Sequence, residues 1–540
     1  MTRRLWPSLV LLAAAAALFT AAALADTSTG GVAGTLRLSR STDIDYVDPA
    51  LAYFSDTFGM IGYATCARLY NYPDRPAPEG AQPIPEVAAA FPSVSRDGRT
   101  VTIALRRSYR FHTGAVVSAR SFVDALNRDA HPKMQSPASQ YLHELEGADA
   151  LLEGKAKRIS GLRALDRWTL RLRLTKPVPE LVGRLTLPFF CPVAPSTSIE
   201  PDGINDPAGS GPYYVAERVV NRRIVLARNR FYTGPRRAHF ERILWTIGPS
   251  LESCRLLTER DETDYCVDGL PPSAYRELAE RYGVNRPNGR LFVSPRLGIA
   301  YFALNHHRAF RNNPWLAKAV NYALDRPSLV RASGYLGGIR TDQLLPPALA
   351  RDADLYPLKG PDLERARALA RGHLPPDNKL VLQTQNRGAR AIRAQLLQYQ
   401  LKQIGLDLQI RVSARAVAGQ PCERRGEQFD ICDEGRLVDY PEAVNLFDPL
   451  LNGERITETA NTNVSYFNEP GVNRRIEQIS RLSGTPRLRA WQQLDIDVMR
   501  RHAPIAPFLV FTQRDFLSAS AGCYLHHPVW GFDLVAACPK

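Results

Sequence analysis

Apolar and polar residues alternate along several short segments, and an amphipathic helical pattern interrupts that alternation further along the chain. Alternation predicts strands at 34–41, 99–106 and 167–175, and again within 211–229 and 240–248. From residue 379 onward, a strand pattern, a helix pattern and a second strand pattern follow in turn, at 379–385, 391–405 and 406–412. Strand, helix and strand at this spacing form a β-α-β unit, so this region is predicted to be α/β.

Two helices have clear start signals in the residues before them. For the first, Gly114 permits a tight turn and Ser118 is a favourable N-cap. For the second, Asn313 is the cap and Pro314 occupies the first helical position. In the helix of the β-α-β unit, the positions predicted to face inward are Ile392, Leu396, Leu397 and Ile404.

The last strand pattern, at 504–517, resembles the first in its strand-like sequence of apolar and polar residues. The region between them includes helical patterns as well. Chains that cross several times between two regions commonly form lobes that clamp a ligand by hinge closure. The pattern therefore predicts a two-lobed protein, and 540 residues leave room for several domains.

The first 25 residues have the three parts of a secretory signal peptide. Arg3 and Arg4 supply positive charge, an apolar run follows, and an A-x-A cleavage motif ends at Ala25, before Asp26. The alternative is an uncleaved membrane anchor. No later stretch has the ~18 consecutive apolar residues of a membrane helix, so we expect a soluble protein exported to the periplasm or the extracellular space.

The formal net charge is +15, but the basic residues are dispersed along the chain. They form no helix-turn-helix, zinc-finger or RNA-binding signature, so nucleic acid is not an expected partner. Sequence motifs of serine hydrolases, zinc proteases and phosphate-binding loops are absent. The adjacent pairs His306-His307 and His526-His527 suit metal poorly, because neighbouring residues of a strand point to opposite faces. We therefore expect no catalytic residue, metal or cofactor.

Eight cysteines in an exported chain predict disulfides. None has the C-x-x-C spacing of a zinc site or redox centre. Sequence alone does not fix the pairing. We predict bonds between the three pairs of near neighbours, with the last two cysteines as the remaining pair: Cys254–Cys266, Cys422–Cys432, Cys523–Cys538 and Cys66–Cys191.

Five segments, in the right order, resemble signatures of the family 5 extracellular solute-binding proteins, the oligopeptide- and dipeptide-binding components of ABC importers. They are DYVDPALAY with CARLYNY, FHTGAVVSARSF, GSGPYYVAERVVNRRIVLARNRFYTG, YFALNHHRAFRNNPWLAKAVNYALDRPSLV and FDICDEGRLVDYPEAVNLFDPLL. The second segment departs from the family signature at Thr113, Val116 and Ser121. In this comparison His112 is a packing residue beside a turn, not a catalytic one.

The resemblance implies an α/β, two-lobed periplasmic-binding-protein fold of the large three-domain type, with mixed sheets flanked by helices and a ligand cleft between the lobes. Residues 1–25 are then the signal peptide and 79–189 form domain II, inserted in domain I. Domain III comprises 296–503. Domain I comprises the segments 34–78, 190–295 and 504–540.

The resemblance also places ligand contacts in the segment GRLVDYPEA. Asp439, followed by Tyr440, occupies the position whose carboxylate receives the α-ammonium group of a bound peptide; the alternative is that it only caps its loop. Arg436 stands where the family usually has tryptophan, and either favours acidic ligands or pairs with Asp439. Tyr46, near the end of the first strand, is a further candidate for the cleft wall.

Three functions remain open. The first is the capture of a peptide-like solute for an ABC importer; the second is the same role for a nickel complex, an opine or a sugar; the third is an exported enzyme. The expected partners are a small peptide or related solute and the permease subunits, with the protein itself a monomer. The solute stays unidentified, because specificity resides in loop residues that no motif fixes.

Overall fold

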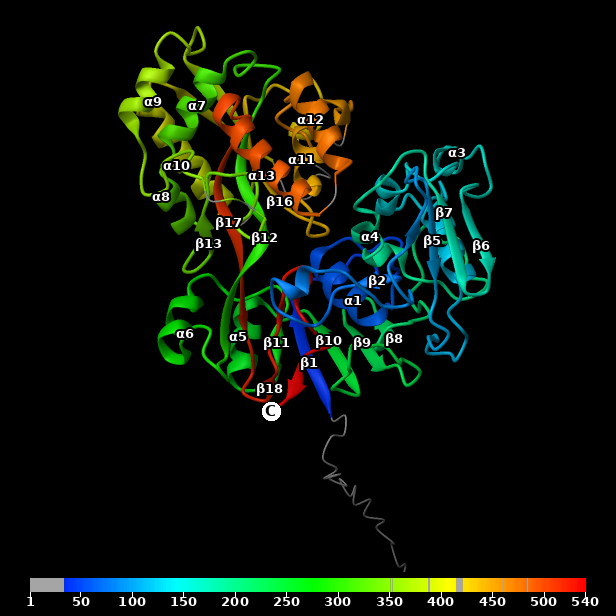
Figure 1. Cartoon of the computed structure of the whole chain (residues 1–540). Helices are drawn as coiled ribbons and strands as arrows, with labels where there is room; N and C mark the ends of the chain where they lie inside the picture. Colours follow the sequence, from blue (N-terminus) through cyan, green and yellow to red (C-terminus); the bar gives the residue numbers. More distant parts are fainter. Residues whose placement is uncertain are drawn as a thin grey trace, which may run out of the picture.

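The computed structural model describes residues 34–349, 351, 353–386, 389–413, 421–459, 461–482 and 484–540. The predicted signal peptide and its cleavage site lie outside the described residues. The described chain forms two lobes, and two long strands run from one lobe into the other: β12 (Leu291–Leu304) and β17 (Ile505–Phe516) (Figure 1). The two-lobed α/β fold is therefore confirmed.

A five-stranded mixed sheet forms the base of the lower lobe in Figure 1. Its alternating pattern buries Leu36 and Leu38 of the first strand, as the sequence predicts. That strand is parallel to both of its neighbours. The order across the sheet is β11 (Tyr265–Cys266), β1 (Thr35–Arg40), β10 (Arg242–Ile247), β9 (Arg223–Arg228) and β8 (Tyr213–Val219).

A four-stranded antiparallel sheet lies beside it, at the right of Figure 1. Helix α2 (Ala119–Asp129) packs on this sheet and buries Phe122 and Leu126, as predicted. The His112 ring stacks on Tyr214 with the ring centroids 3.9 Å apart, which makes it a packing residue. The order across the sheet is β4 (Ser93–Val94), β5 (Thr100–Ala104), β7 (Thr169–Arg173) and β6 (Leu162–Asp166).

The upper lobe is built on a six-stranded sheet. Its parallel pair β14 (Lys379–Gln385) and β15 (Asp407–Ser413), with helix α10 (Arg390–Lys402) between them in sequence, confirms the predicted β-α-β unit. The prediction that Ile392 faces inward is wrong: it is 53% exposed, because the buried stripe runs through Ala394, Leu397 and Leu401. The order is β13 (Gly338–Arg340), β17, β12, β16 (Ile431–Leu437), β14 (Lys379–Gln385) and β15 (Asp407–Ser413).

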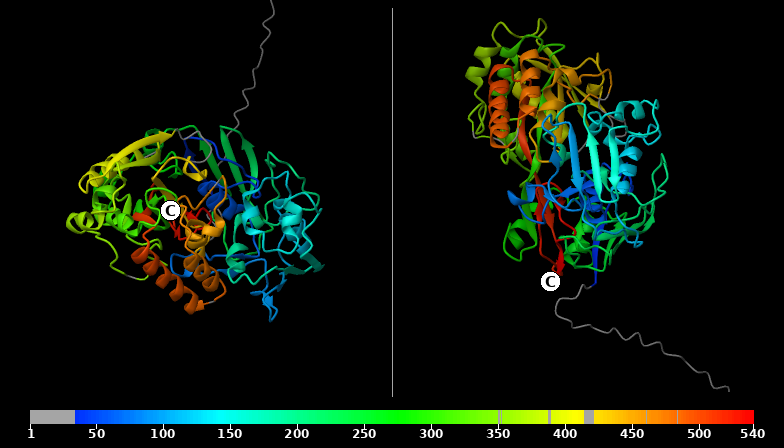
Figure 2. Two further views of the ribbon diagram at one scale, coloured as in Figure 1. Left: turned by 90° about the horizontal axis from the view of Figure 1, so that it is seen from above. Right: turned by 45° about the vertical axis from the view of Figure 1, so that its right-hand side comes forward.

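Helices cover these sheets in both lobes, as the further views in Figure 2 show. The N-cap predicted at Asn313 is confirmed, since its side chain accepts a bond from the Leu316 N–H at 3.1 Å. The other helices are α1 (Gly62–Thr65), α3 (Ala148–Leu152), α4 (Leu181–Arg184), α5 (Leu251–Glu259), α6 (Ala274–Tyr282), α7 (Pro314–Ala323), α8 (Arg326–Arg331), α9 (Leu363–Ala370), α11 (Val444–Leu451), α12 (Pro470–Ser480) and α13 (Gly484–Arg501).

The two crossing strands pair with each other along most of their length, but their register shifts between Pro295 and Ile299. This irregularity lies where the strands pass between the lobes. Strand β17 joins the six-stranded sheet although residues 504–540 are predicted to belong to domain I. The crossing is thus shared by both lobes, and the domain boundaries stay a prediction.

The disulfides confirm the predicted pairing in full. The bonds are Cys66–Cys191, Cys254–Cys266, Cys422–Cys432 and Cys523–Cys538. The first bond closes the longest loop, with a sequence separation of 125 residues, and so ties together the two segments of the predicted domain I that flank domain II.

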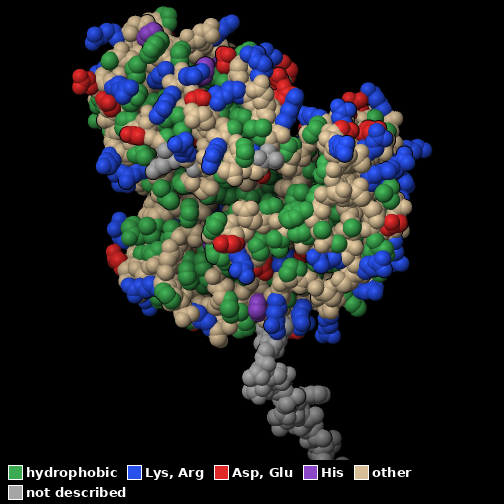
Figure 3. All heavy atoms as spheres, in the orientation of Figure 1, with side chains coloured by type: hydrophobic (Ala, Val, Ile, Leu, Met, Phe, Trp, Pro, Cys, Tyr) green, Lys and Arg blue, Asp and Glu red, His purple; other side chains and the backbone are tan. Residues whose placement is uncertain are grey.

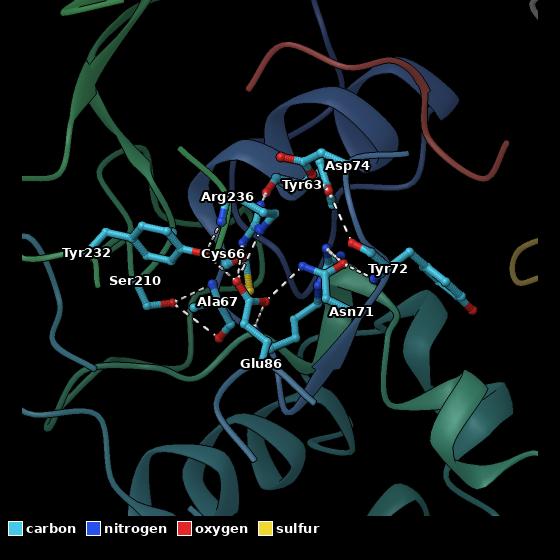
Figure 4. A network of polar contacts seen from close by, with 12 residues as sticks. Tyr63, Cys66, Ala67, Asn71, Tyr72, Asp74, Glu86, Ser210, Tyr232 and Arg236 are labelled. Carbon is cyan, nitrogen blue, oxygen red and sulfur yellow. Dashed lines mark hydrogen bonds and ion pairs between the residues drawn. The ribbon is translucent and has the colours of Figure 1, made fainter. Parts of the chain in front are cut away.

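A buried polar network lies beside this first disulfide (Figure 4). The Arg236 guanidinium donates to the Glu86 carboxylate at 2.7 Å and to the Cys66 carbonyl at 2.7 Å. Tyr232 and Asn71 donate to the two oxygens of the same carboxylate, at 2.7 and 2.8 Å. The Arg236 guanidinium and the Glu86 carboxylate thus both have hydrogen-bond partners within the network. This ion pair is therefore a structural element of the lower lobe.

The outer surface agrees with the dispersed charge of the sequence. On the face seen in Figure 3, Lys and Arg side chains are scattered over both lobes, and the surface is hollowed between them. Among the described residues, no helix combines the length and apolar character that crossing a membrane requires.

Candidate functional site

A cavity of about 1120 Å³ lies between the lobes and is lined by residues from both. The lower lobe contributes Tyr53, Phe58 of the π-helical turn Thr57–Ile61 that leads into α1, and the segment around Trp530. The upper lobe contributes β16, the start of α10 and the end of α8. This is a sufficient volume for a small-molecule or short-peptide ligand, and a site between two lobes is a common position for one.

Asp439 lies at this cavity, in the loop after β16. One of its oxygens, Oδ2, accepts bonds from Arg436 at 2.7 Å and from the Tyr141 hydroxyl at 2.8 Å. The other, Oδ1, has only a long contact of 3.4 Å from the Tyr53 hydroxyl. Burial and the Asp439 charge raise the pKa of both tyrosines, so both remain protonated donors. The carboxylate therefore joins three segments and keeps one oxygen with spare acceptor capacity.

Arg436 both lines the cavity and pairs with Asp439. Burial is the largest single effect and opposes its charge, but the Asp439 carboxylate and the nearby tyrosines together outweigh it and raise the pKa of the guanidinium. Of the two roles that the sequence left open, pairing is thus present, and the exposed side of the guanidinium still faces the cavity.

Tyr440 and Tyr46 lie elsewhere. Tyr440 is 3% exposed and packs edge-on against Tyr141, with ring centroids 6.4 Å apart. Its contact with Tyr141 supports the loop that carries Asp439, but Tyr440 itself is not among the residues that line the cavity. Tyr46 packs against Leu51 and Met134 in a separate small cluster. The structure therefore does not bring Tyr46 into this cavity.

Sequence reasoning missed most of the cavity's arginines. Arg390 and Arg393 lie at the start of α10, just beyond the carboxyl end of the parallel strand β14. Ligands commonly bind beyond the carboxyl ends of parallel strands, and this rule could have indicated both arginines. Arg296 has no local signal, because it lies within the strand crossing. Tyr53 and Tyr141 come from distant segments that meet Asp439 only in the folded protein.

Glu434 is the second carboxylate at the cavity. Its burial raises its pKa to about 7, although the nearby Arg390, at 3.9 Å, opposes this shift. Glu434 also lies close to Cys422 and Cys432, and in the described part of the chain these three are the one group with metal-like spacing. Both sulfurs are consumed by a disulfide, so this group offers no thiolate ligands.

Comparison with known proteins agrees with this architecture. Residues 82–458 match the model of the bacterial extracellular solute-binding proteins, family 5. The periplasmic murein peptide-binding protein MppA of Escherichia coli K12 is 24% identical over 450 residues, 80% of this chain and 81% of MppA. The periplasmic oligopeptide-binding protein OppA of Salmonella typhimurium is 28% identical over 273 residues, 49% of each chain, so that match spans about half of OppA.

Among solved structures, the clavulanic acid biosynthesis oligopeptide binding protein 2 superposes with a TM-score of 0.86 at 26% identity, over 94% of this chain and 95% of that one. The unliganded open form of MppA superposes with a TM-score of 0.74 at 21% identity, over 94% and 97% of the two chains. The family match covers well over half of the sequence, and the fold matches along nearly all of it. This chain belongs to the bacterial extracellular solute-binding proteins of family 5.

Proposed function

We propose that this chain captures a short peptide between its two lobes and delivers it to the permease of an ABC importer, from the periplasm or the outer face of the membrane. The cavity between the lobes is the observation that carries the proposal, because it offers about 1120 Å³ lined from both sides of a strand crossing. The export signal in the sequence and the peptide-binding relatives MppA and OppA support it.

Asp439 is the proposed partner of the ligand's α-ammonium group. Its Oδ2 is already bonded to Arg436 and Tyr141, while Oδ1 has only the 3.4 Å contact from Tyr53. An ammonium group placed at Oδ1 gains a charge-assisted bond without displacing Arg436. Such a bond contributes on the order of 1.5–3 kcal/mol, a roughly 10- to 150-fold change in affinity.

The test uses a random tetrapeptide library and its N-acetylated counterpart, with retained peptides detected by native mass spectrometry. The wild-type protein is expected to retain free peptides and to bind the acetylated ones more weakly by the factor above. Asp439→Asn should lose most of this discrimination between free and acetylated peptides. The variant lacks the contact between the carboxylate and the ammonium group, so acetylation of the peptide has little further effect. Asp448→Asn is the matched control, because Asp448 lies nearby in α11, pairs with Arg455 at 2.9 Å and does not line the cavity.

Retention of no peptide from either library, together with release of a non-peptide solute from the purified protein on denaturation, would overturn the proposal. Peptide retention with equal discrimination in wild type and Asp439→Asn would leave the peptide function standing and would remove Asp439 from the ammonium site.

A further inference from the structure

The charges that line the cavity are strongly unbalanced. Two carboxylates, Glu434 and Asp439, face six guanidinium groups, which come from β12, β16, β17, α10 and the end of α8. The six are Arg296, Arg331, Arg390, Arg393, Arg436 and Arg514. A peptide with one ammonium group and one carboxylate is neutral, so it leaves this surplus of positive charge as large as before.

Half of these arginines are already neutralised by the protein. Arg436 pairs with Asp439 at 2.7 Å, and Arg393 lies 3.5 Å from the carboxylate of Asp433. Arg390 lies 3.9 Å from Glu434. These three have protein carboxylates to stabilise them, and the surplus is carried by the other three.

The remaining three, Arg296, Arg331 and Arg514, have no ion pair to any described residue. Arg514 donates to the Tyr335 carbonyl at 2.9 Å and stacks over the Tyr275 ring at 4.1 Å. Both contacts leave its charge unneutralised. Arg331 is exposed at the rim, where water solvates it.

Arg296 is the least compensated of the three. Within the described residues it has neither a hydrogen bond nor an ion pair, and it lies in β12 between Pro295 and Ile299, where the pairing with β17 shifts. Burial lowers the pKa of its guanidinium, and the charges of Asp515 and Asp56 offset that only in part. A withdrawn cation without a partner is costly unless a ligand supplies the partner.

We propose that the cavity selects peptides with acidic side chains, and that Arg296, assisted by Arg514 and Arg331, receives a side-chain carboxylate of the ligand. The inference rests on the proposed function and specifies the substrate class of the same site. A guanidinium binds a carboxylate through two parallel N–H bonds, which gives geometric selectivity as well as affinity. Basic peptides are disfavoured by the same surplus of charge.

The test compares three tetrapeptides of similar size, Ala-Glu-Glu-Ala, Ala-Gln-Gln-Ala and Ala-Lys-Lys-Ala, by titration calorimetry at pH 7.5. The wild-type protein is expected to bind the glutamate peptide at least tenfold more tightly than the glutamine peptide, and the lysine peptide most weakly. The preference should persist in 0.5 M salt, because a direct contact is screened much less than a distant charge.

Arg296→Gln should reduce the ratio of the two dissociation constants roughly tenfold, with the glutamine peptide bound as before. Arg411→Gln is the matched control: it removes the same charge from an exposed position on β15 of the same sheet, outside the cavity. Circular dichroism verifies folding of each variant. If Arg296→Gln does not fold, Arg514→Gln takes its place, with a smaller reduction of about threefold.

The inference is overturned, while the peptide function stands, if the wild-type protein binds the glutamate and glutamine peptides equally. It is also overturned if the ratio of their dissociation constants in Arg296→Gln and Arg514→Gln is the same as in Arg411→Gln. Binding of none of the three peptides, together with no retention from the random library, overturns the proposed function and this inference with it.

Discussion

Arg236 in the lower lobe and Arg296 in the strand crossing are both guanidinium groups withdrawn from bulk water, and the protein treats them in opposite ways. Arg236 is 2% exposed and donates to the Glu86 carboxylate and to the carbonyls of Tyr63 and Cys66. Arg296 lines a cavity and bonds to no described residue.

The difference distinguishes a structural charge, that of Arg236, from a charge available to bind a ligand, that of Arg296. A buried ion pair with all its donors satisfied holds segments of one lobe together, and its loss is felt as instability. A cation with vacant donors at a cavity contributes little to folding, and its loss is felt in binding. Variants of the two clusters should therefore divide between two measurements, the free energy of unfolding and the ligand dissociation constant.

The largest effect is expected from Glu86→Gln. The variant removes the ion-pair partner of the buried Arg236, so the free energy of unfolding should fall by roughly 3–5 kcal/mol. Urea denaturation measures it, and peptide affinity of the folded fraction should not change. Glu241→Gln is the control, because Glu241 pairs with Arg228 at 3.1 Å at the surface, where such pairs contribute about 0–1 kcal/mol. Equal losses in the two variants would contradict the structural role of the Glu86 pair.

Removal of the Cys66–Cys191 disulfide weakens the same lobe by another route. The double Cys→Ser variant should lose roughly 2–4 kcal/mol, because the unfolded chain regains the freedom of a long loop. Removing Cys254–Cys266, with a separation of 12 residues against 125, should cost about 2 kcal/mol less on the same loop-length argument. Thermal and urea unfolding provide the comparison. A larger loss for the short loop would argue that local packing, not loop closure, sets the contribution.

Local sequence patterns predicted the short-range elements of both lobes well and the strand crossing poorly. The capped helix α2 and the β-α-β unit have signals within a few residues. Short spacings favoured three of the disulfides, and the fourth, Cys66–Cys191, was the pair that remained. Strand β12 extends from Leu291 to Leu304, a region in which the alternation of apolar and polar residues predicts no strand of this length. Pro295 and Gly298 interrupt the alternation there, and long-range pairing with β17 overrides them.

The cavity was predictable only in part, for a similar reason. Asp439 and Arg436 belong to one segment with a family signature, so the sequence placed both, and the structure has both at the cavity. Tyr53, Tyr141 and Arg296 lie in three other segments, and their convergence depends on how the lobes pack. The inward orientation of Ile392 failed because alanine, not isoleucine, occupies the buried stripe of α10 at that turn.

A smaller effect is expected from pH, through Glu434. Its pKa of about 7 means that it loses its charge as the pH falls from 8 to 6, which increases the positive surplus of the cavity. A bound anion raises that pKa further, so affinity for Ala-Glu-Glu-Ala should increase roughly three- to tenfold over this interval. Burial lowers the pKa of His526, which lies near Arg296. Calorimetry at several pH values measures the trend, and Glu434→Gln should flatten it. A trend of unchanged slope in Glu434→Gln would assign it to another group.

The smallest effects concern the two tyrosines at Asp439, and they test whether contacts at the cavity act on binding alone. Tyr141→Phe removes a 2.8 Å bond to the carboxylate and should weaken tetrapeptide binding by roughly three- to tenfold, the effect of one ordinary hydrogen bond. Tyr53→Phe removes only a 3.4 Å contact, which is beyond the usual O–H···O range, so its effect should be under about threefold. Tyr399→Phe is the control, since that ring is 66% exposed on α10. Calorimetry and urea denaturation on all three proteins separate affinity from stability. If Tyr141→Phe destabilises the protein as much as Glu86→Gln does, the Tyr141 hydroxyl has a structural role like that of the Glu86 cluster. The contrast between structural charges and binding charges would then not hold for Asp439.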